Sequence, residues 1–88
     1  MYNIEIKPSC QSDIEKLCKK NNSLKIALEK KINEILENPY HYKPLRYVLA
    51  GERRVHIMKS FVLKFEIHDN RNSVEFISFC HHDDAYRR

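Results

Sequence analysis

The stretch that decides the fold is FVLKFEIHDNRNSVEFISFC, which occupies residues 61–80. Apolar side chains stand at every second position from 61 to 67, and the alternation resumes after the polar cluster at residues 69–72. A period of two is typical of strands, and clustered Asp and Asn are typical of tight turns. The stretch therefore predicts two antiparallel strands. On the second strand we expect Val74, Phe76 and Ser78 on one face and Glu75, Ile77 and Phe79 on the other.

A third strand is expected before this pair. Gly51, the only glycine in the chain, marks a turn, and the period of two starts directly after it. Two faces are predicted for this strand, one with Val55 and Ile57 and the other with Arg54, His56 and Met58. Three strands joined by short turns form an antiparallel meander.

The N-terminal half shows the periodicity of one short strand and two helices. Residues 2–7 alternate, and Pro8 ends that strand. The capping box Ser12-x-x-Glu15, or alternatively Ser9, is expected to begin the first helix. Residues 21–23 are expected to cap a second helix that ends at Asn38-Pro39. Its apolar stripe contains Leu24, Leu28, Ile32, Ile35 and Leu36.

These elements predict one α+β domain, residues 1–88, with the order β-α-α-β-β-β. In it the N-terminal strand and the helical hairpin pack on one face of a small, mainly antiparallel sheet. No apolar run approaches the roughly 18 residues of a membrane span, and no secretory signal is evident, so we expect a cytoplasmic protein. The cysteines Cys10, Cys18 and Cys80 are odd in number and lack metal-binding spacing, so we expect reduced and packed thiols.

The net charge of +4 is concentrated in one segment. Residues 40–60 contain one acid, Glu52, and five bases, namely Lys43, Arg46, Arg53, Arg54 and Lys59. Such a block indicates a polyanionic or acidic partner. The alternative interpretation is a solvated basic loop and strand without a special role.

The C-terminal segment CHHDDAYRR, residues 80–88, raises the question of a metal site. His81 and His82 are adjacent, so on a continuing strand they would point to opposite faces and could not hold one ion. His56 or Asp84 could complete a site, but no ligand spacing in the sequence specifies one. We therefore predict no metal and no cofactor.

Metal-independent RNA cleavage suits these residues better. It needs a base for the 2′-hydroxyl, an acid for the leaving 5′-oxygen, and cations for the phosphate. Imidazole serves both proton transfers near neutral pH, and arginine binds phosphate through two hydrogen bonds. The meander and the tail offer Arg53, Arg54, His56, Lys59, His82 and Tyr86. Histidines on a small sheet can equally be structural or merely exposed.

The chain resembles the RelE/ParE toxin superfamily of type II toxin–antitoxin systems along nearly its whole length. The likeness includes Gly51-Glu52-Arg53-Arg54, the run Phe61-Val62-Leu63-Lys64-Phe65, and the ending His-His-Asp-Asp-Ala-Tyr at residues 81–86. It is most similar to the YafQ-like branch, in which arginine precedes a histidine and a late histidine lies four residues before an aromatic. Here Arg54 precedes His56, and His82 lies four residues before Tyr86. Val62 and Ser78 stand where relatives carry arginine.

The resemblance implies an mRNA interferase, an endoribonuclease toxin that cuts mRNA on the ribosome and so blocks translation. It implies His82 as general acid or base and His56 as its counterpart. Arg54 would hold the phosphate with help from Arg53 or Lys59, and Tyr86 would stack on or orient the nucleotide. Further RNA contacts are expected from Lys43, Arg46 and His81, while Asp84 could orient a histidine. The implied partners are a cognate antitoxin, the ribosomal decoding site and mRNA.

Two alternatives remain open. A ParE-like inhibitor of DNA gyrase would need no acid/base pair, and the paired histidines argue against it. A degenerate toxin that only binds its antitoxin is favoured by Val62 and Ser78, the two positions that lack the arginines of relatives.

Overall fold

The computed structural model describes residues 1–42 and 52–85, so the turn predicted at Gly51 lies outside the described residues. The predicted α+β order is confirmed, with two short 3₁₀ segments and a final helical turn in addition. The elements are β1 (Asn3–Ile6), α1 (Pro8–Cys18), α2 (Asn22–Glu37), η1 (Pro39–His41), β2 (Glu52–Ile57), β3 (Phe61–His68), η2 (Asp69–Arg71), β4 (Ser73–His81) and α3 (His82–Ala85).

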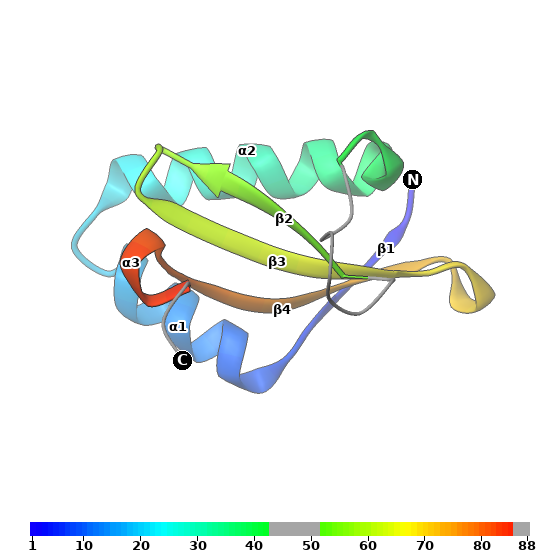
Figure 1. Ribbon diagram of the computed structural model, residues 1–88, viewed down its shortest axis with the longest axis horizontal. Coiled ribbons are helices and arrows are strands. Elements are labelled where there is room, and N and C mark those ends of the chain that lie inside the picture. Colours follow the sequence, from blue (N-terminus) through cyan, green and yellow to red (C-terminus); the bar gives the residue numbers. More distant parts are fainter. Residues whose placement is uncertain (43–51, 86–88) are drawn as a thin grey trace.

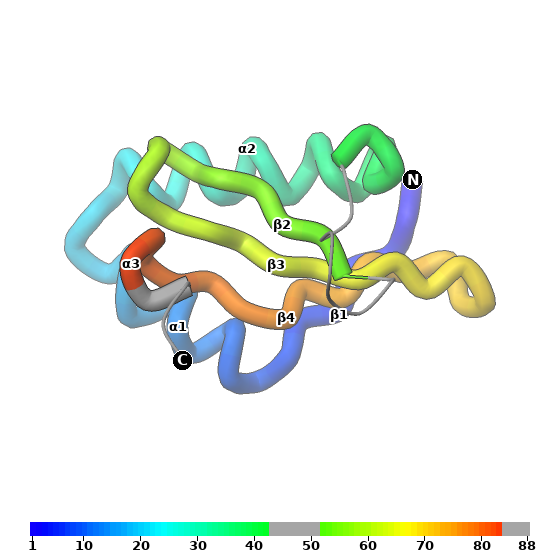
Figure 2. Tube along the Cα trace, viewed as in Figure 1, coloured from blue at the N-terminus to red at the C-terminus, as the bar shows by residue number. Residues whose placement is uncertain are grey.

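The four strands form one sheet in the order β1-β4-β3-β2. β1 runs parallel to β4, and the other neighbouring strands are antiparallel. Figure 1 shows α1 and α2 on one face of this sheet, and Figure 2 shows how the chain returns from β3 to β4. The opposite face, called the open face below, carries Arg54, His56, Lys64 and Ser78. No helix in the described part of the chain is long and apolar enough to cross a membrane.

The core lies between the two helices and the sheet. Its fully buried side chains include Cys10, Leu24, Ile35, Leu63, Phe65, Val74, Phe76 and Phe79. The apolar stripe predicted for the second helix is confirmed, with Ile32 partly buried at its edge. The three cysteines are free thiols, as expected. Burial raises the pKa of the Cys10 thiol to about 11, because the thiolate would lose its hydration, so this residue behaves as a small apolar side chain.

The two helices begin differently. Asn21 caps α2, since its Oδ1 accepts a hydrogen bond of 3.1 Å from the backbone N–H of Leu24. The cap predicted for the first helix, Ser9 or Ser12, was wrong, because α1 already begins at Pro8. Proline suits the first helical position, where its φ is preset and its missing N–H would have no helical partner. Only Lys7 therefore separates β1 from α1.

The last strand departs from the predicted alternation. Phe65 pairs with Phe76 while Lys64 pairs with Ser78, so Ile77 is an extra residue that forms a β-bulge. The bulge shifts the pleat by one residue, which puts Phe79 in the core together with Phe76. The prediction that Phe79 faces the other way was wrong, because strict alternation assumes an uninterrupted ladder.

Polar side chains fasten the N-terminal segment to the turn between β3 and β4. Asp69 accepts hydrogen bonds from the hydroxyls of Tyr2 and Tyr40, and Arg71 binds both carboxylate oxygens of Glu5 at 2.8 and 3.0 Å. The hydrogen bond to Asp69 raises the pKa of Tyr2 to about 12. Hydrogen bonds from Arg71 and then Ser73 lower the pKa of Glu5 to about 2. Charge-assisted hydrogen bonds thus hold β1 against η2.

Ile35 and Ile26 provide a matched test of the core within one helix. We predict that Ile35→Ala lowers the free energy of unfolding by about 2–5 kcal/mol, because it leaves a cavity at a fully buried position. Ile26→Ala should change it by less than about 0.5 kcal/mol, because that side chain is 58% exposed. Urea denaturation followed by circular dichroism measures both, and equal losses would contradict the described packing.

The pair of Glu5 and Arg71 predicts an acid-sensitive contribution to stability. Because the folded pKa of Glu5 lies below its ordinary value of 4.5, the contribution is fully present above about pH 4.5 and is lost as the pH falls toward about 2. Wild type and Glu5→Gln should therefore differ in Tm near neutral pH and converge in strong acid. The control is Glu29→Gln at an exposed position of α2. A difference from wild type that stays constant across the pH range would contradict this assignment.

Candidate active site

His56 of β2 and His82 of α3 meet on the open face. Their ring centroids are 5.5 Å apart, and the ring planes are tilted by 35°. The backbone N–H of His82 donates a hydrogen bond to the carbonyl of Ser60, which fixes the start of α3 against the turn between β2 and β3. His56 is exposed and the His82 side chain is 45% exposed, so a ligand can reach both rings.

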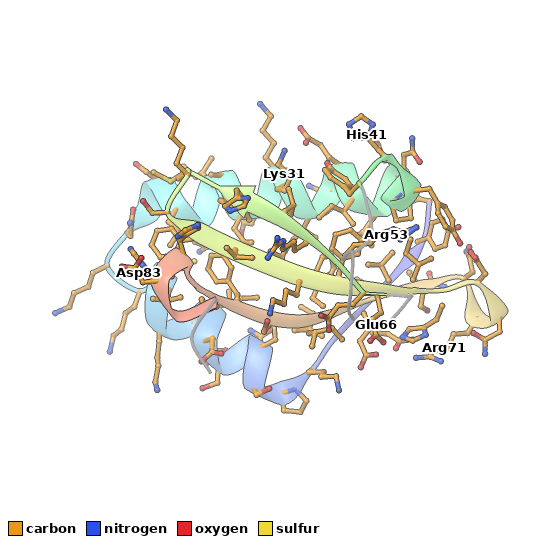
Figure 3. The ribbon with its side chains drawn as sticks, in the orientation of Figure 1. Lys31, His41, Arg53, Glu66, Arg71 and Asp83 are labelled. Carbon is orange, nitrogen blue, oxygen red and sulfur yellow. The ribbon has the colours of Figure 1, made fainter. Side chains whose placement is uncertain are left out.

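His81 lies on the helix-covered face. It pairs with Phe61 across the sheet, and its ring centroid is 5.5 Å from that of Phe61. Oxygens of the Asp83 carboxylate lie 3.8 Å from Nδ1 of both His81 and His82, at the α3 end of the sheet in Figure 3. The condition for the predicted divergence of the two histidines, a continuing strand, is not met, because β4 ends at His81 and α3 begins at His82. Only His82 therefore joins His56, and His81 is not part of the pair.

Two cationic residues occupy the neighbouring row of the open face. Arg54 pairs with Lys64, and Lys64 pairs with Ser78, which forms a row across three strands. The next row of the open face contains His56 of β2, which pairs with Val62 of β3. Successive rows on one face are about 7 Å apart. The long side chains of Arg54 and Lys64 can span that interval. A negatively charged group held at the histidines would lie within their reach.

Lys64 was not among the residues predicted for the site. The alternation of β3 already put Lys64 on the face that Leu63 and Phe65 do not share. Its neighbours on the adjacent strands β2 and β4 follow only from the register. Lys64 lies directly opposite Ser78 and two residues along β3 from Val62. Both Val62 and Ser78 are positions at which arginine is expected from the superfamily pattern. Val62 is fully buried, so its side chain does not serve as a ligand group.

Arg53, expected to assist Arg54, lies on the opposite face. It pairs with Phe65, and its guanidinium carbon is 5.2 Å from the ring centroid of Tyr40. Its Nε is buried and finds no hydrogen-bond partner within the described ranges. Figure 3 places Arg53 away from Asp83 and α3. The structure therefore does not bring Arg53 to the histidine pair. Lys59, the other residue expected to assist, is exposed in the turn next to Ser60 and has a φ of 65°.

Several predicted residues fall outside the described structure. These are Lys43, Arg46 and Tyr86, together with the side chain of Asp84. Their roles in RNA binding, base stacking and histidine orientation stay predictions.

A pocket of about 610 Å³ opens between the helices α1 and α2. Its lining includes the apolar side chains of Ile14, Leu28 and Ile32 and the charged side chains of Glu15 and Lys25. A lining that combines apolar and charged side chains suits one face of an amphipathic segment.

Comparison with known proteins places the chain in a family. Residues 4–86 match the family described as the ParE toxin of the type II toxin–antitoxin system, parDE. The chain is 47% identical over 88 residues to RelE4 of Methanocaldococcus jannaschii, whose own assignment as a toxin is provisional. That match covers 100% of this chain and 94% of the relative.

Two solved structures have a similar fold. One is a metal-bound toxin from Helicobacter pylori, with a TM-score of 0.80, 25% identity and coverage of 98% of this chain and 100% of that one. The other is YafQ in the DinJ–YafQ complex from E. coli, with a TM-score of 0.78, 19% identity and coverage of 99% and 100%. The family match, the close relative and the shared architecture agree with the resemblance seen in the sequence. The chain thus belongs to the RelE/ParE superfamily, as a member of the ParE toxin family of type II toxin–antitoxin systems.

Proposed function

We propose that this toxin is a metal-independent endoribonuclease that cuts mRNA on the ribosome. The observation that carries the proposal is the pairing of His56 with His82, with ring centroids 5.5 Å apart, on the face that also presents Arg54 and Lys64. Two imidazoles can transfer the two protons of RNA cleavage, and two cations can neutralise the phosphate.

The two histidines would act in sequence on one phosphodiester. One neutral imidazole takes the proton of the 2′-hydroxyl, and the 2′-oxygen attacks the phosphorus. The bond from phosphorus to the 5′-oxygen of the next nucleotide breaks, and the second, protonated imidazole gives its proton to that oxygen. The products are a 2′,3′-cyclic phosphate and a free 5′-hydroxyl. His56 of β2 and His82 of α3 would fill these two roles, one as the base and the other as the acid.

Arg54 and Lys64 would hold the phosphate during this step. Lys64 stands opposite Ser78, so the row keeps a positive charge beside a position where relatives carry arginine. A lysine is a compact point charge, whereas arginine binds phosphate in a fixed two-pronged geometry. The presence of Lys64 favours an active nuclease over a degenerate toxin.

The ribosome would supply the positioning that a chain of 88 residues lacks. Alignment of the attacking oxygen with the leaving oxygen lowers the activation free energy of such reactions by a large amount. The decoding site holds mRNA in a defined path, and exposed basic residues such as Lys59 would contact ribosomal RNA. This part of the proposal rests on the family resemblance.

A cognate antitoxin is the other proposed partner. The E. coli relative YafQ was solved in complex with DinJ. In this chain the pocket between α1 and α2, with Leu28 and Ile32 in its lining, has the chemistry to accept an amphipathic helix laid across the helical hairpin. Binding there would leave the open face accessible, so inhibition would need a further antitoxin segment along the basic residues.

Primer extension on an mRNA translated in a cell-free system tests the nuclease. His82→Ala and His56→Ala should each lower the cutting rate by about 10²–10⁴-fold, the usual worth of general acid/base catalysis. His41→Ala changes an exposed histidine of η1 and should cut at the wild-type rate. Circular dichroism confirms that each variant is folded, and omission of ribosomes should abolish the cuts.

Absence of cuts in every lane, with translation unimpaired, would refute the nuclease. A supercoiling assay with DNA gyrase then separates a gyrase inhibitor from a toxin that only binds its antitoxin. Cuts that persist without ribosomes would support the nuclease activity but show that it does not depend on the ribosome.

The two faces of β2 predict different effects of neighbouring arginines on RNA binding. In a His82→Ala background, Arg54→Gln and Lys64→Gln should each lower the slope of log K against log salt for single-stranded RNA by about 0.7, the value of one phosphate contact. Arg53→Gln should leave the slope unchanged, because Arg53 lies over the Tyr40 ring on the other face of the sheet. Fluorescence anisotropy at several salt concentrations measures the slopes. A change for Arg53 and none for Arg54 would contradict the assignment of faces.

A further inference from the structure

Four glutamates, one from each strand, form an acidic row across the open face. Glu52 pairs with Glu66, Glu66 with Glu75, and Glu75 with Glu5. Like charges directly opposite one another on neighbouring strands destabilise a sheet, so this row needs cations. Arg71 neutralises Glu5 and donates hydrogen bonds of 2.8 and 3.0 Å to its carboxylate. Arg71 also attracts Glu75 electrostatically, while His68 lies beside both central carboxylates, Glu66 and Glu75.

His68 approaches these two carboxylates from the same face. Its Nε2 lies 2.9 Å from Oε1 of Glu75 and 3.6 Å from Oε1 of Glu66. Glu66 and His68 are two residues apart on β3, and the turn at η2 brings Glu75 of β4 opposite Glu66. The three side chains are only 23–27% exposed.

The three ligand atoms are close enough together to hold one metal ion. They lie within 4.8 Å of one another. Ligands placed about 2.0–2.1 Å from a tetrahedral Zn²⁺ ion are separated by about 3.3 Å, and the two distances from His68 Nε2 lie on either side of that value. One imidazole nitrogen and two carboxylate oxygens suit zinc and leave a fourth position for water. A dication would also offset both carboxylates at once.

We propose that Glu66, His68 and Glu75 bind a divalent transition-metal ion, for which Zn²⁺ is the best match. The ion joins β3 to β4 beside their turn and leaves one coordination position to water. Four residues along β3 separate Glu66 from Val62, the neighbour of His56, which is about 13 Å. Figure 3 likewise shows Glu66 and Arg71 toward the end of the sheet that is remote from Asp83. The ion therefore takes no part in proton transfer at the histidine pair.

Zinc titration of the full chain by isothermal calorimetry tests the site. After treatment with chelator and buffer exchange, wild type should bind one Zn²⁺ per chain. His68→Gln and Glu75→Gln should each weaken binding by about 100-fold or more, because even outer partners of a metal site are worth about 10- to 100-fold in affinity. His41→Gln, on η1 and outside the cluster, is the matched control and should bind as wild type does.

A second readout separates a specific site from general zinc capture. Zn²⁺ should raise the Tm of wild type and of His41→Gln but not that of His68→Gln, since only binding to the folded state stabilises it. Circular dichroism verifies that the variants are folded without metal. Saturable binding that survives His68→Gln and disappears in His56→Gln would overturn the proposal, because the ion would then sit at the histidine pair. Absence of saturable binding in wild type would overturn it as well.

Discussion

The extra residue at Ile77 controls which side of the sheet each C-terminal side chain occupies. A ladder without the bulge would carry Ser78 and Cys80 on the helix side and Phe79 and His81 on the other. With the bulge, Phe79 completes the core, and the chain enters α3 with His82 on the side of His56. Core packing and the approach of the two histidines therefore depend on the same single-residue insertion in one strand. Bulges commonly re-aim side chains next to active sites.

The overall fold was accessible from the sequence because two periodicities are strong. The stripe from Leu24 to Leu36 specified a buried helical face, and alternation in residues 61–67 specified a strand with one buried side. Two local features were not accessible. Ser9 and Ser12 are both good N-caps in isolation, so they concealed the actual start of α1 at Pro8. The bulge at Ile77 depends on pairing with Lys64 and Phe65 of another strand. Pairing partners are not encoded in the pattern of one strand.

The candidate site was accessible only in part for the same reason. Residue chemistry and family likeness selected His56, His82 and Arg54, and the structure brings the two histidines together and places Arg54 on the same face. The period of two already put Arg54 on the face of His56, whereas Arg53, expected to assist it, lies on the helix-covered face against Tyr40. Lys64 was missed because its neighbours on β2 and β4 follow only from cross-strand register, and the cluster was missed because register brings Glu75 of β4 to Glu66 and His68 of β3.

The core cluster, within the described residues, ends at Phe79, and the positions that follow lie outside it. His82 is held instead by a backbone hydrogen bond to Ser60, which any residue but proline can make. The His82 side chain also lies against the His56 ring and near the Asp83 carboxylate, so residue 82 links the end of β4 to the candidate site. A substitution at this position would therefore change both the docking of α3 on the sheet and the chemistry available beside His56.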